Sequence, residues 1–153
     1  MKIRELGSNE KLAWINLVKE GDRRGRIWAE QKFDSYILSK KKKRLLVVVE
    51  NMKLIGFAGI KGEDLEENVS KELNEKYLLI NWIAFVPEFR NKGLGSKLLS
   101  ECEKYALEWD KKGIWLGCKN GVIPFYKKNG YKMSGNFIND KGKEENLMIK
   151  EIH

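Results

Sequence analysis

The sequence predicts one α/β domain over residues 1–153, with a mixed central sheet of about six to seven strands flanked by about four helices. Two observations predict this fold class. Short β-rich segments alternate with segments of helical periodicity, and one strand, helix, strand succession has the length of a right-handed crossover between parallel neighbours. The chain has 153 residues, of which 42% are hydrophobic, so it can bury an apolar core without disulfides or metal ions.

The first elements are an expected edge strand and a helix. Residues 2–6 alternate polar and apolar side chains, as an edge strand does. Ser8 or Asn9 then offers an N-cap for a helix that runs to about Lys19.

A second helix is predicted after a break framed by two glycines, Gly21 and Gly25. Its apolar residues recur on one face, which indicates core packing. These residues are Ala29, Phe33, Tyr36 and Ile37. The basic run over 40–44 ends the helix, and we interpret it as a solvated loop in preference to a nucleic-acid patch.

Residues 45–50 and 54–60 are β-rich and are separated by a three-residue connection, which is typical of an antiparallel hairpin. The acidic segment 61–76 has no clear period. It predicts a long loop with room for one helical turn, of the kind that borders substrate sites.

Three further elements form the crossover unit. Residues 77–86 are a continuous apolar run interrupted only by Asn81, which is typical of a strand buried on both faces. Residues 92–109 have helical periodicity, and Gly113 is expected to stop this helix. A short buried strand over 114–118 follows.

The C-terminal part predicts a short helix and two more strands. Pro124 belongs to the first turn of a helix that runs to Lys128, and Gly130 ends it. Strands near Tyr131 and over 147–152 complete the chain. Their exposed edges would allow two chains to pair as a homodimer.

Charge and residue counts limit the function classes. Lys and Arg number 30 against 22 Asp and Glu, and the net charge of +8 favours an anionic partner such as a phosphorylated cofactor, nucleic acid or a membrane surface. The one histidine is His153, so histidine-based acid–base catalysis and Ser-His-Asp triads are excluded. Cys102 and Cys118 lie in apolar patterns without a CxxC pair, which predicts reduced core thiols and no metal site.

The N-terminal residues lack the apolar region of a signal peptide, and no segment reaches the apolar length of a membrane span. We therefore expect a cytoplasmic protein that does not associate with membranes.

A glycine-containing turn over 85–97 joins the buried strand to the long helix. Unpaired N–H groups and partial positive charge at a helix N-terminus bind phosphate oxygens, and Gly93 and Gly95 allow close backbone approach. Three basic residues add positive charge there: Arg90, Lys92 and Lys97. The alternative is that the glycines only shape a tight connection. A dinucleotide motif would need glycine in place of Leu98, and no GxxxxGK[ST] phosphate loop is present.

The R-x-x-G-x-G pattern of residues 90–95, between a strand and a helix, resembles the acetyl-CoA pyrophosphate motif of the GNAT superfamily of N-acyltransferases. A second segment, IPFYKKNGY over 123–131, resembles the later motif of that family, in which a short helix carrying Phe-Tyr leads through a glycine into a strand. The order and separation of the motifs agree with the family over residues 45–134.

The resemblance implies a strongly twisted sheet whose strands 77–86 and 114–118 splay apart to admit the pantetheine arm of acetyl-CoA, with no metal ion required. Backbone groups of the first strand would bind the pantetheine amides, and N–H groups of the turn would hold the pyrophosphate. The implied cofactor-binding residues are Phe85, Val86, Arg90, Asn91, Lys92, Gly93, Leu94, Gly95, Ser96 and Asn120.

Three positions depart from the family pattern. Asn91 replaces the commoner glycine, although asparagine tolerates unusual backbone angles. Phe85 replaces a small aliphatic residue, and Asn120 lies one residue closer to Tyr126 than the pattern implies.

Tyr126 matches the family tyrosine whose hydroxyl protonates the departing thiolate; the alternative is a core aromatic residue. The strand over 77–86 contains no Asp or Glu, so the amine must lose its proton to water or to a loop carboxylate. Glu72 and Glu75 are the candidate carboxylates, and Asn81 is a candidate for orienting water. Among the tryptophans, Trp28 and then Trp82 are candidates for a wall of the acceptor pocket.

The leading hypothesis is acetyl transfer from acetyl-CoA to a primary amine of a small molecule or peptide, by direct attack in a ternary complex without an acyl-cysteine. The second is a non-catalytic acyl-CoA sensor. A nucleic-acid-binding module that uses the basic run ranks last. Acidic residues over 63–67 point to a cationic acceptor.

Overall fold

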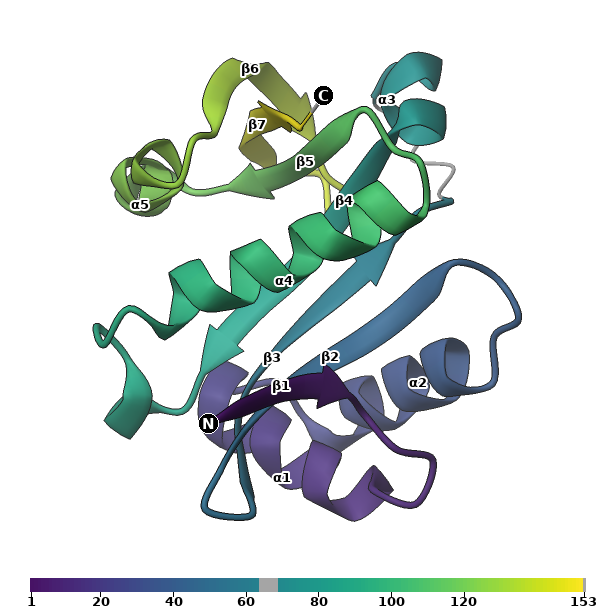
Figure 1. The fold of residues 1–153 in the computed structure, drawn as a ribbon, viewed down its shortest axis with the longest axis vertical. Helices are drawn as coiled ribbons and strands as arrows, with labels where there is room; N and C mark the ends of the chain where they lie inside the picture. Colours follow the sequence, from purple (N-terminus) through teal and green to yellow (C-terminus); the bar gives the residue numbers. More distant parts are fainter. Residues whose placement is uncertain (64–68, 153) are drawn as a thin grey trace. The chain divides into compact units, whose positions relative to one another are not determined.

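The structure is a computed structural model that describes residues 1–63 and 69–152 (Figure 1). Its seven strands form a mixed sheet in the order β1-β2-β3-β4-β5-β7-β6. The chain divides into two compact units, residues 1–60 with 82–98, and residues 61–81 with 99 to the C-terminus. Strand β4 and helix α4 contribute residues to both units. The mixed α/β sheet is confirmed, and the single-domain organisation stays a prediction.

The first unit contains the N-terminal strands and helices. Its elements are β1 (Lys2–Glu5), α1 (Lys11–Asp22), α2 (Arg26–Ile37), β2 (Lys43–Glu50), β3 (Lys53–Lys61), the second half of β4 (Tyr77–Phe85), the 3-10 turn η1 (Pro87–Phe89) and the start of α4 (Leu94–Glu108).

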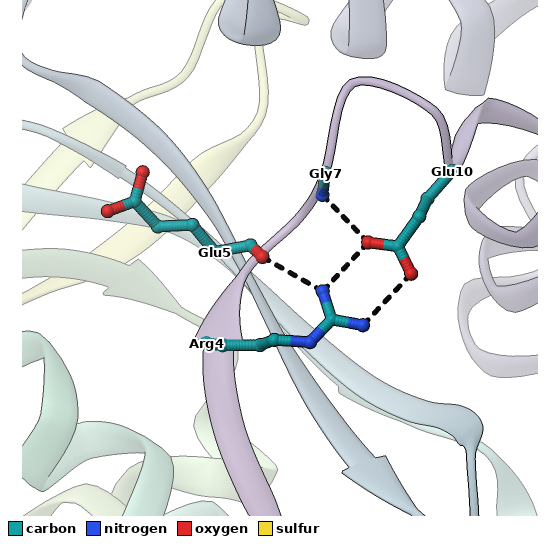
Figure 2. A network of polar contacts seen from close by, with 4 residues as sticks. All are labelled: Arg4, Glu5, Gly7 and Glu10. Atoms are coloured by element: carbon teal, nitrogen blue, oxygen red, sulfur yellow. Dashed lines mark hydrogen bonds and ion pairs between the residues drawn. The ribbon is translucent and has the colours of Figure 1, made fainter.

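A bidentate ion pair connects β1 to the start of α1 (Figure 2). Arg4 Nη1 and Nη2 donate to the Glu10 carboxylate at 2.7 and 2.9 Å, and the Gly7 N–H donates to the same group at 2.7 Å. These bonds hold the pKa of Glu10 below its usual range. The N-cap position belongs to Glu10 and has no side-chain cap, so the expected capping by Ser8 or Asn9 was wrong.

Helices α1 and α2 pack through Trp14, which is fully buried. Its Nε1 donates to the Ala29 carbonyl at 2.8 Å, and its ring meets the edge of Phe57 on β3 at 4.9 Å. Helix α1 continues past the expected end, because Gly21 is accommodated inside it and the left-handed residue that ends it is Arg23, with φ of 56°. Of the predicted apolar face of α2, Ala29, Phe33 and Tyr36 are buried, and Ile37 is half-buried.

Strands β2 and β3 form the predicted hairpin through a two-residue turn. Asn51 and Met52 adopt φ of 49° and 65°, the left-handed pair that matches the twist of adjoining strands. The four central residues of β2, 45–48, are buried.

Two glycines of β3 allow large side chains of β4 to lie directly on the strand. A Cβ atom at Gly56 would overlap the Phe85 ring, and one at Gly59 would overlap the Trp82 ring. Strand β4 was expected to be buried on both faces, but residues 81–84 are only half-buried. In this second half of β4, the rings of Trp82 and Phe85 therefore pack directly on the glycine backbone of β3.

The second unit contains the first half of β4 and the C-terminal elements. These are α3 (Lys71–Lys76), the rest of α4, β5 (Gly113–Cys118), the 3-10 turn η2 (Asn120–Val122), α5 (Ile123–Lys128), β6 (Lys132–Ile138) and β7 (Glu144–Glu151). Tyr77 pairs in parallel with Gly113, as the crossover prediction required. Strand β5 pairs antiparallel with β7, and β7 with β6.

One expectation for this unit was wrong in detail. Gly113 does not stop the helix: α4 ends at Glu108, Asp110 adopts φ of 55°, and Gly113 begins β5, where a Cβ atom would collide with the Lys150 carbonyl. The segment expected as a loop with one helical turn contains the six-residue helix α3, which brings the α-helices among the described residues to five.

The described residues include no helix that is both long enough and apolar enough to cross a bilayer. Residues 64–67 of the acidic segment lie outside the described residues, and the expected contribution of this segment to acceptor binding stays a prediction.

The contact of Gly59 with Trp82 makes this glycine a stability determinant. Gly59→Ala should lower the free energy of unfolding in urea by roughly 1–3 kcal/mol, because the indole must move out of a packed position. Gly121→Ala is the control, since a Cβ atom there meets nothing within 4 Å. Equal stability of the two variants would contradict the packing of Trp82 on Gly59.

Candidate functional site

The predicted phosphate turn lies in the first unit, between η1 and α4. Asn91 and Gly93 both adopt left-handed backbone, with φ of 60° and 77°. The 15-residue helix α4 begins immediately afterwards at Leu94, so the N–H groups of its first turn have no partner within the helix. A Cβ atom at Gly93 would meet nothing within 4 Å, which leaves the space above its backbone open to a ligand.

Arg90 fixes the turn to the rest of the first unit. Its Nε donates to the Phe85 carbonyl at 3.0 Å, and its Nη2 donates to the Gly21 carbonyl at 2.9 Å. The guanidinium therefore joins the last turn of α1 to the end of β4. Lys92 and Lys97 remain exposed near the turn, where they contribute positive charge.

The backbone of Phe85 and Val86 is already paired in part. The Val86 N–H donates to the Ile55 carbonyl at 2.9 Å, and the Val86 carbonyl accepts from the Phe89 N–H at 3.0 Å. Because a carbonyl oxygen has two lone pairs, the carbonyls of both residues keep the capacity to accept a further bond. The Val86 N–H cannot donate to pantetheine unless it leaves Ile55.

Tyr126 lies on α5 in the second unit, with its ring packed edge-on against Phe125 at 5.0 Å and Tyr131 at 5.7 Å. Burial raises the pKa of Tyr126 to about 12, and the nearby Cys118 and Cys102 add to the shift. The hydroxyl is therefore protonated throughout the neutral pH range.

Tyr131, at the start of the next strand, has a buried hydroxyl for which the described residues supply no hydrogen-bond partner. Burial raises its pKa above the ordinary tyrosine value. The thiols of Cys102 and Cys118 are also buried, and burial raises the pKa of each. Both cysteines are therefore neutral at pH 7 and poorly suited to carry an acyl group.

Asn120 lies in η2, at the end of β5, and its Oδ1 accepts a hydrogen bond from Asn146 Nδ2 at 2.8 Å. Asn146 is nine-tenths buried, and its Nδ2 also donates to the Cys118 carbonyl at 3.1 Å. This side chain of β7 therefore fixes both Asn120 and the end of β5.

A cavity of about 360 Å³ opens beside these residues. It is lined by Cys118, Lys119, Asn120, Asn136, Glu144, Glu145 and Asn146. Among the polar residues of this cavity, only Asn120 was a candidate site residue from the sequence. The available signal was the polar cluster that precedes the apolar run of β7, but the expected strand began at residue 147 and left this cluster outside it.

The remaining candidates are distributed over the surface of α3, over β4 and over α2. The exposed Glu72 and Glu75 lie within 3.4 and 3.6 Å of lysines 112 and 71. Trp28 and Trp82 meet edge to face at 5.0 Å in the first unit, and their expected place in the wall of an acceptor pocket stays a prediction. The described residues contain no group of three or more His, Cys, Asp or Glu side chains that could hold a metal ion.

Comparisons with known proteins agree with these features. The sequence model of a family described as "Acetyltransferase (GNAT) family" matches residues 9–131. A protein of Methanocaldococcus jannaschii named as an uncharacterized N-acetyltransferase is 27% identical over 108 residues, which cover 69% of this chain and 46% of that protein. The chain thus spans about half the length of this curated relative.

Two solved structures share the fold. Aminoglycoside 6'-N-acetyltransferase from Enterococcus faecium superposes with a TM-score of 0.75 at 17% identity, covering 100% of this chain and 98% of that one. The PaiA N-acetyltransferase from Thermoplasma acidophilum, solved in complex with coenzyme A, gives a TM-score of 0.68 at 19% identity, covering 99% and 98%.

The raised pKa of Tyr126 predicts a pH dependence of stability. A tyrosine whose folded pKa is about 12 favours folding fully below pH 10, and this contribution is lost as the pH rises from about 10 to about 12. Between pH 9.5 and 11, urea unfolding should show a smaller loss of stability for Tyr126→Phe than for the wild type. Parallel losses in the two proteins would show that the Tyr126 hydroxyl is not buried.

Proposed function

Since the chain belongs to the acetyltransferase (GNAT) family, we propose that it transfers an acetyl group from acetyl-CoA to a primary amine by direct attack in a ternary complex. The observation that carries this proposal is the left-handed turn at Asn91 and Gly93, which opens onto the first N–H groups of a long helix. The coenzyme A complex of a protein with the same fold supports the choice of co-substrate.

In the proposed complex the backbone of residues 91–96 binds the pyrophosphate, because amide dipoles and the helix N-terminus favour negative charge. The open space above Gly93 fits this role. Arg90 positions the turn through its two carbonyl contacts, and its expected contact with phosphate stays a prediction. The carbonyls of Phe85 and Val86 supply acceptors for the amide N–H groups of pantetheine.

Acetyl-CoA supplies an activated thioester, from which a neutral amine displaces the coenzyme A thiolate. We assign to the Tyr126 hydroxyl the stabilisation of this departing sulfur. A tyrosine with a pKa of about 12 is a weaker acid than a thiol, whose pKa is ordinarily about 8.5. The hydroxyl therefore acts chiefly as a hydrogen-bond donor to the developing charge, and the thiol takes its final proton from solvent.

The amine must also lose a proton. Strand β4 carries no carboxylate, and the exposed Glu72 and Glu75 have lysine partners. We therefore propose that water removes the proton, with the half-buried Asn81 of β4 as the residue that orients it. The acceptor is an amine of a small molecule or a peptide.

The alternative function is a non-catalytic acyl-CoA sensor. A sensor would share the phosphate turn with an enzyme, but it would leave the bound thioester intact. Release of free thiol from acetyl-CoA in the presence of an amine panel distinguishes the two, because a sensor binds the thioester without consuming it. Cytoplasmic location and homodimer formation stay predictions.

Tyr126→Phe should lower kcat roughly a hundredfold while leaving the Kd for coenzyme A nearly unchanged, since only the donor to the departing sulfur is lost. The measurements are steady-state thiol release and calorimetry. Tyr131→Phe is the matched control, because it removes a buried hydroxyl that has no partner among the described residues. Full activity of Tyr126→Phe would remove Tyr126 from the reaction.

Gly93→Val should weaken coenzyme A binding by about tenfold or more, because the valine side chain occupies the space above the turn. Gly142→Val is the control: Gly142 has a nearly equal φ of 75° and equally open surroundings. Both variants should lose about 1–2 kcal/mol of stability from backbone strain. If calorimetry finds equal coenzyme A affinity in the two, the phosphate turn has been placed wrongly.

A further inference from the structure

The charged side chains that line the cavity at the end of β5 are mostly negative, although the chain as a whole is positively charged. The protein carries a net charge of +8, but the charged residues lining this cavity are two carboxylates, Glu144 and Glu145, and a single ammonium, Lys119. Lys119 is exposed and Glu145 is half-buried. The cavity thus has locally negative charge within a basic protein.

One amide among the residues that line the cavity, Asn146, keeps a hydrogen-bond acceptor. Both hydrogens of Asn146 Nδ2 are used, one on the Cys118 carbonyl and one on Asn120 Oδ1. The described residues place no donor on Asn146 Oδ1, so this nine-tenths buried amide offers an unpaired oxygen. A ligand there must bring a hydrogen-bond donor.

The two carboxylates are held in place by neighbouring amides and keep further lone pairs. Asn136 Nδ2 donates to Glu144 Oε1, and Asn139 Nδ2 donates to Glu145 Oε2 at 3.3 Å. A carboxylate has about four acceptor positions, so each retains capacity for a ligand. Gly117 brings Glu145 close to β5, since a Cβ atom at Gly117 would lie 3.0 Å from Glu145 Oε2.

This set of groups favours an organic cation. An anion would face two carboxylates against the single ammonium of Lys119, and a neutral apolar group would leave the remaining acceptor positions of the carboxylates unfilled. The described residues hold no cluster of three or more metal-binding side chains. An alkylammonium group brings positive charge and three donors, which match the carboxylates and the Asn146 oxygen.

Cys118 links the cavity to the residue that we assign to the reaction. Cys118, at the end of β5, lines the cavity. The same residue lies near enough to Tyr126 to affect its titration. Both features belong to the second unit, and a volume of about 360 Å³ accommodates a short alkyl chain together with its charged end.

We propose that this cavity binds a second, positively charged group of the acceptor, so that the preferred substrate is a diamine or polyamine whose other amino group is acetylated. This inference rests on the proposed acetyltransferase function. It assigns to Glu144, Glu145 and Asn146 the selection of the substrate.

The test compares 1,4-diaminobutane with 1-butylamine, which differ only in the second amino group. At saturating acetyl-CoA, the wild type should show a kcat/KM about tenfold or more higher for the diamine. The double variant Glu144→Gln, Glu145→Gln should lose this preference, because its kcat/KM should fall about tenfold more for the diamine than for butylamine.

A control variant separates local from overall charge. Glu20→Gln with Glu108→Gln also raises the net charge by two, at exposed positions that do not line the cavity. It should retain the preference for the diamine. Equal losses in the two double variants, or equal kcat/KM for the two amines in the wild type, would overturn the proposal.

Calorimetry without acetyl-CoA gives a readout that does not depend on turnover. The wild type should bind 1,4-diaminobutane, and the Glu144→Gln, Glu145→Gln variant should bind it about tenfold more weakly. If the diamine binds but neither amine is acetylated, the proposed function fails and the cavity assignment stands. If both amines are acetylated equally and the diamine shows no binding, the cavity assignment fails and the function stands. Competition by millimolar magnesium chloride at the same carboxylates would assign the cavity to a metal ion and overturn the proposal.

Discussion

The first unit depends on the two hydrogen bonds that the Arg90 guanidinium donates to backbone carbonyls. One carbonyl belongs to Gly21 in the last turn of α1, and the other belongs to Phe85 at the end of β4. Gly21 also packs against this segment, since a Cβ atom there would lie in van der Waals contact with the Phe85 carbonyl carbon at 3.4 Å. The arginine therefore fixes the chain immediately before the left-handed turn. The geometry of the proposed phosphate site thus depends on these two hydrogen bonds, neither of which involves a phosphate group.

Elements that depend on local chemistry were predictable from the sequence. The β2–β3 hairpin follows from the short connection between two apolar runs, and the long helix follows from its apolar period. The turn at Asn91 and Gly93 was predictable because these residue types tolerate left-handed backbone. Helix ends were less predictable. Arg4 of β1 forms an ion pair with Glu10 at the N-cap of α1, where a cap by Ser8 or Asn9 was expected.

The cavity of the second unit was not predictable, because it depends on strand register. Asn146 pairs with Cys118 only because β7 runs antiparallel to β5 in this alignment, and a shift of one residue would turn the amide to the other face. Glu144 and Glu145 look like solvated charges in the sequence. The phosphate turn, in contrast, is contained in one continuous segment, and such sites are visible in a pattern of residues.

The paired amides of Asn146 and Asn120 have a consequence for recognition. The Asn146 amide is held in place before any ligand arrives, because its N–H groups are anchored to β5 and η2. A prearranged acceptor loses little rotational freedom when a ligand binds. The protein would then select among amines by the distance between their two charged groups. It would not adjust its own structure to each amine.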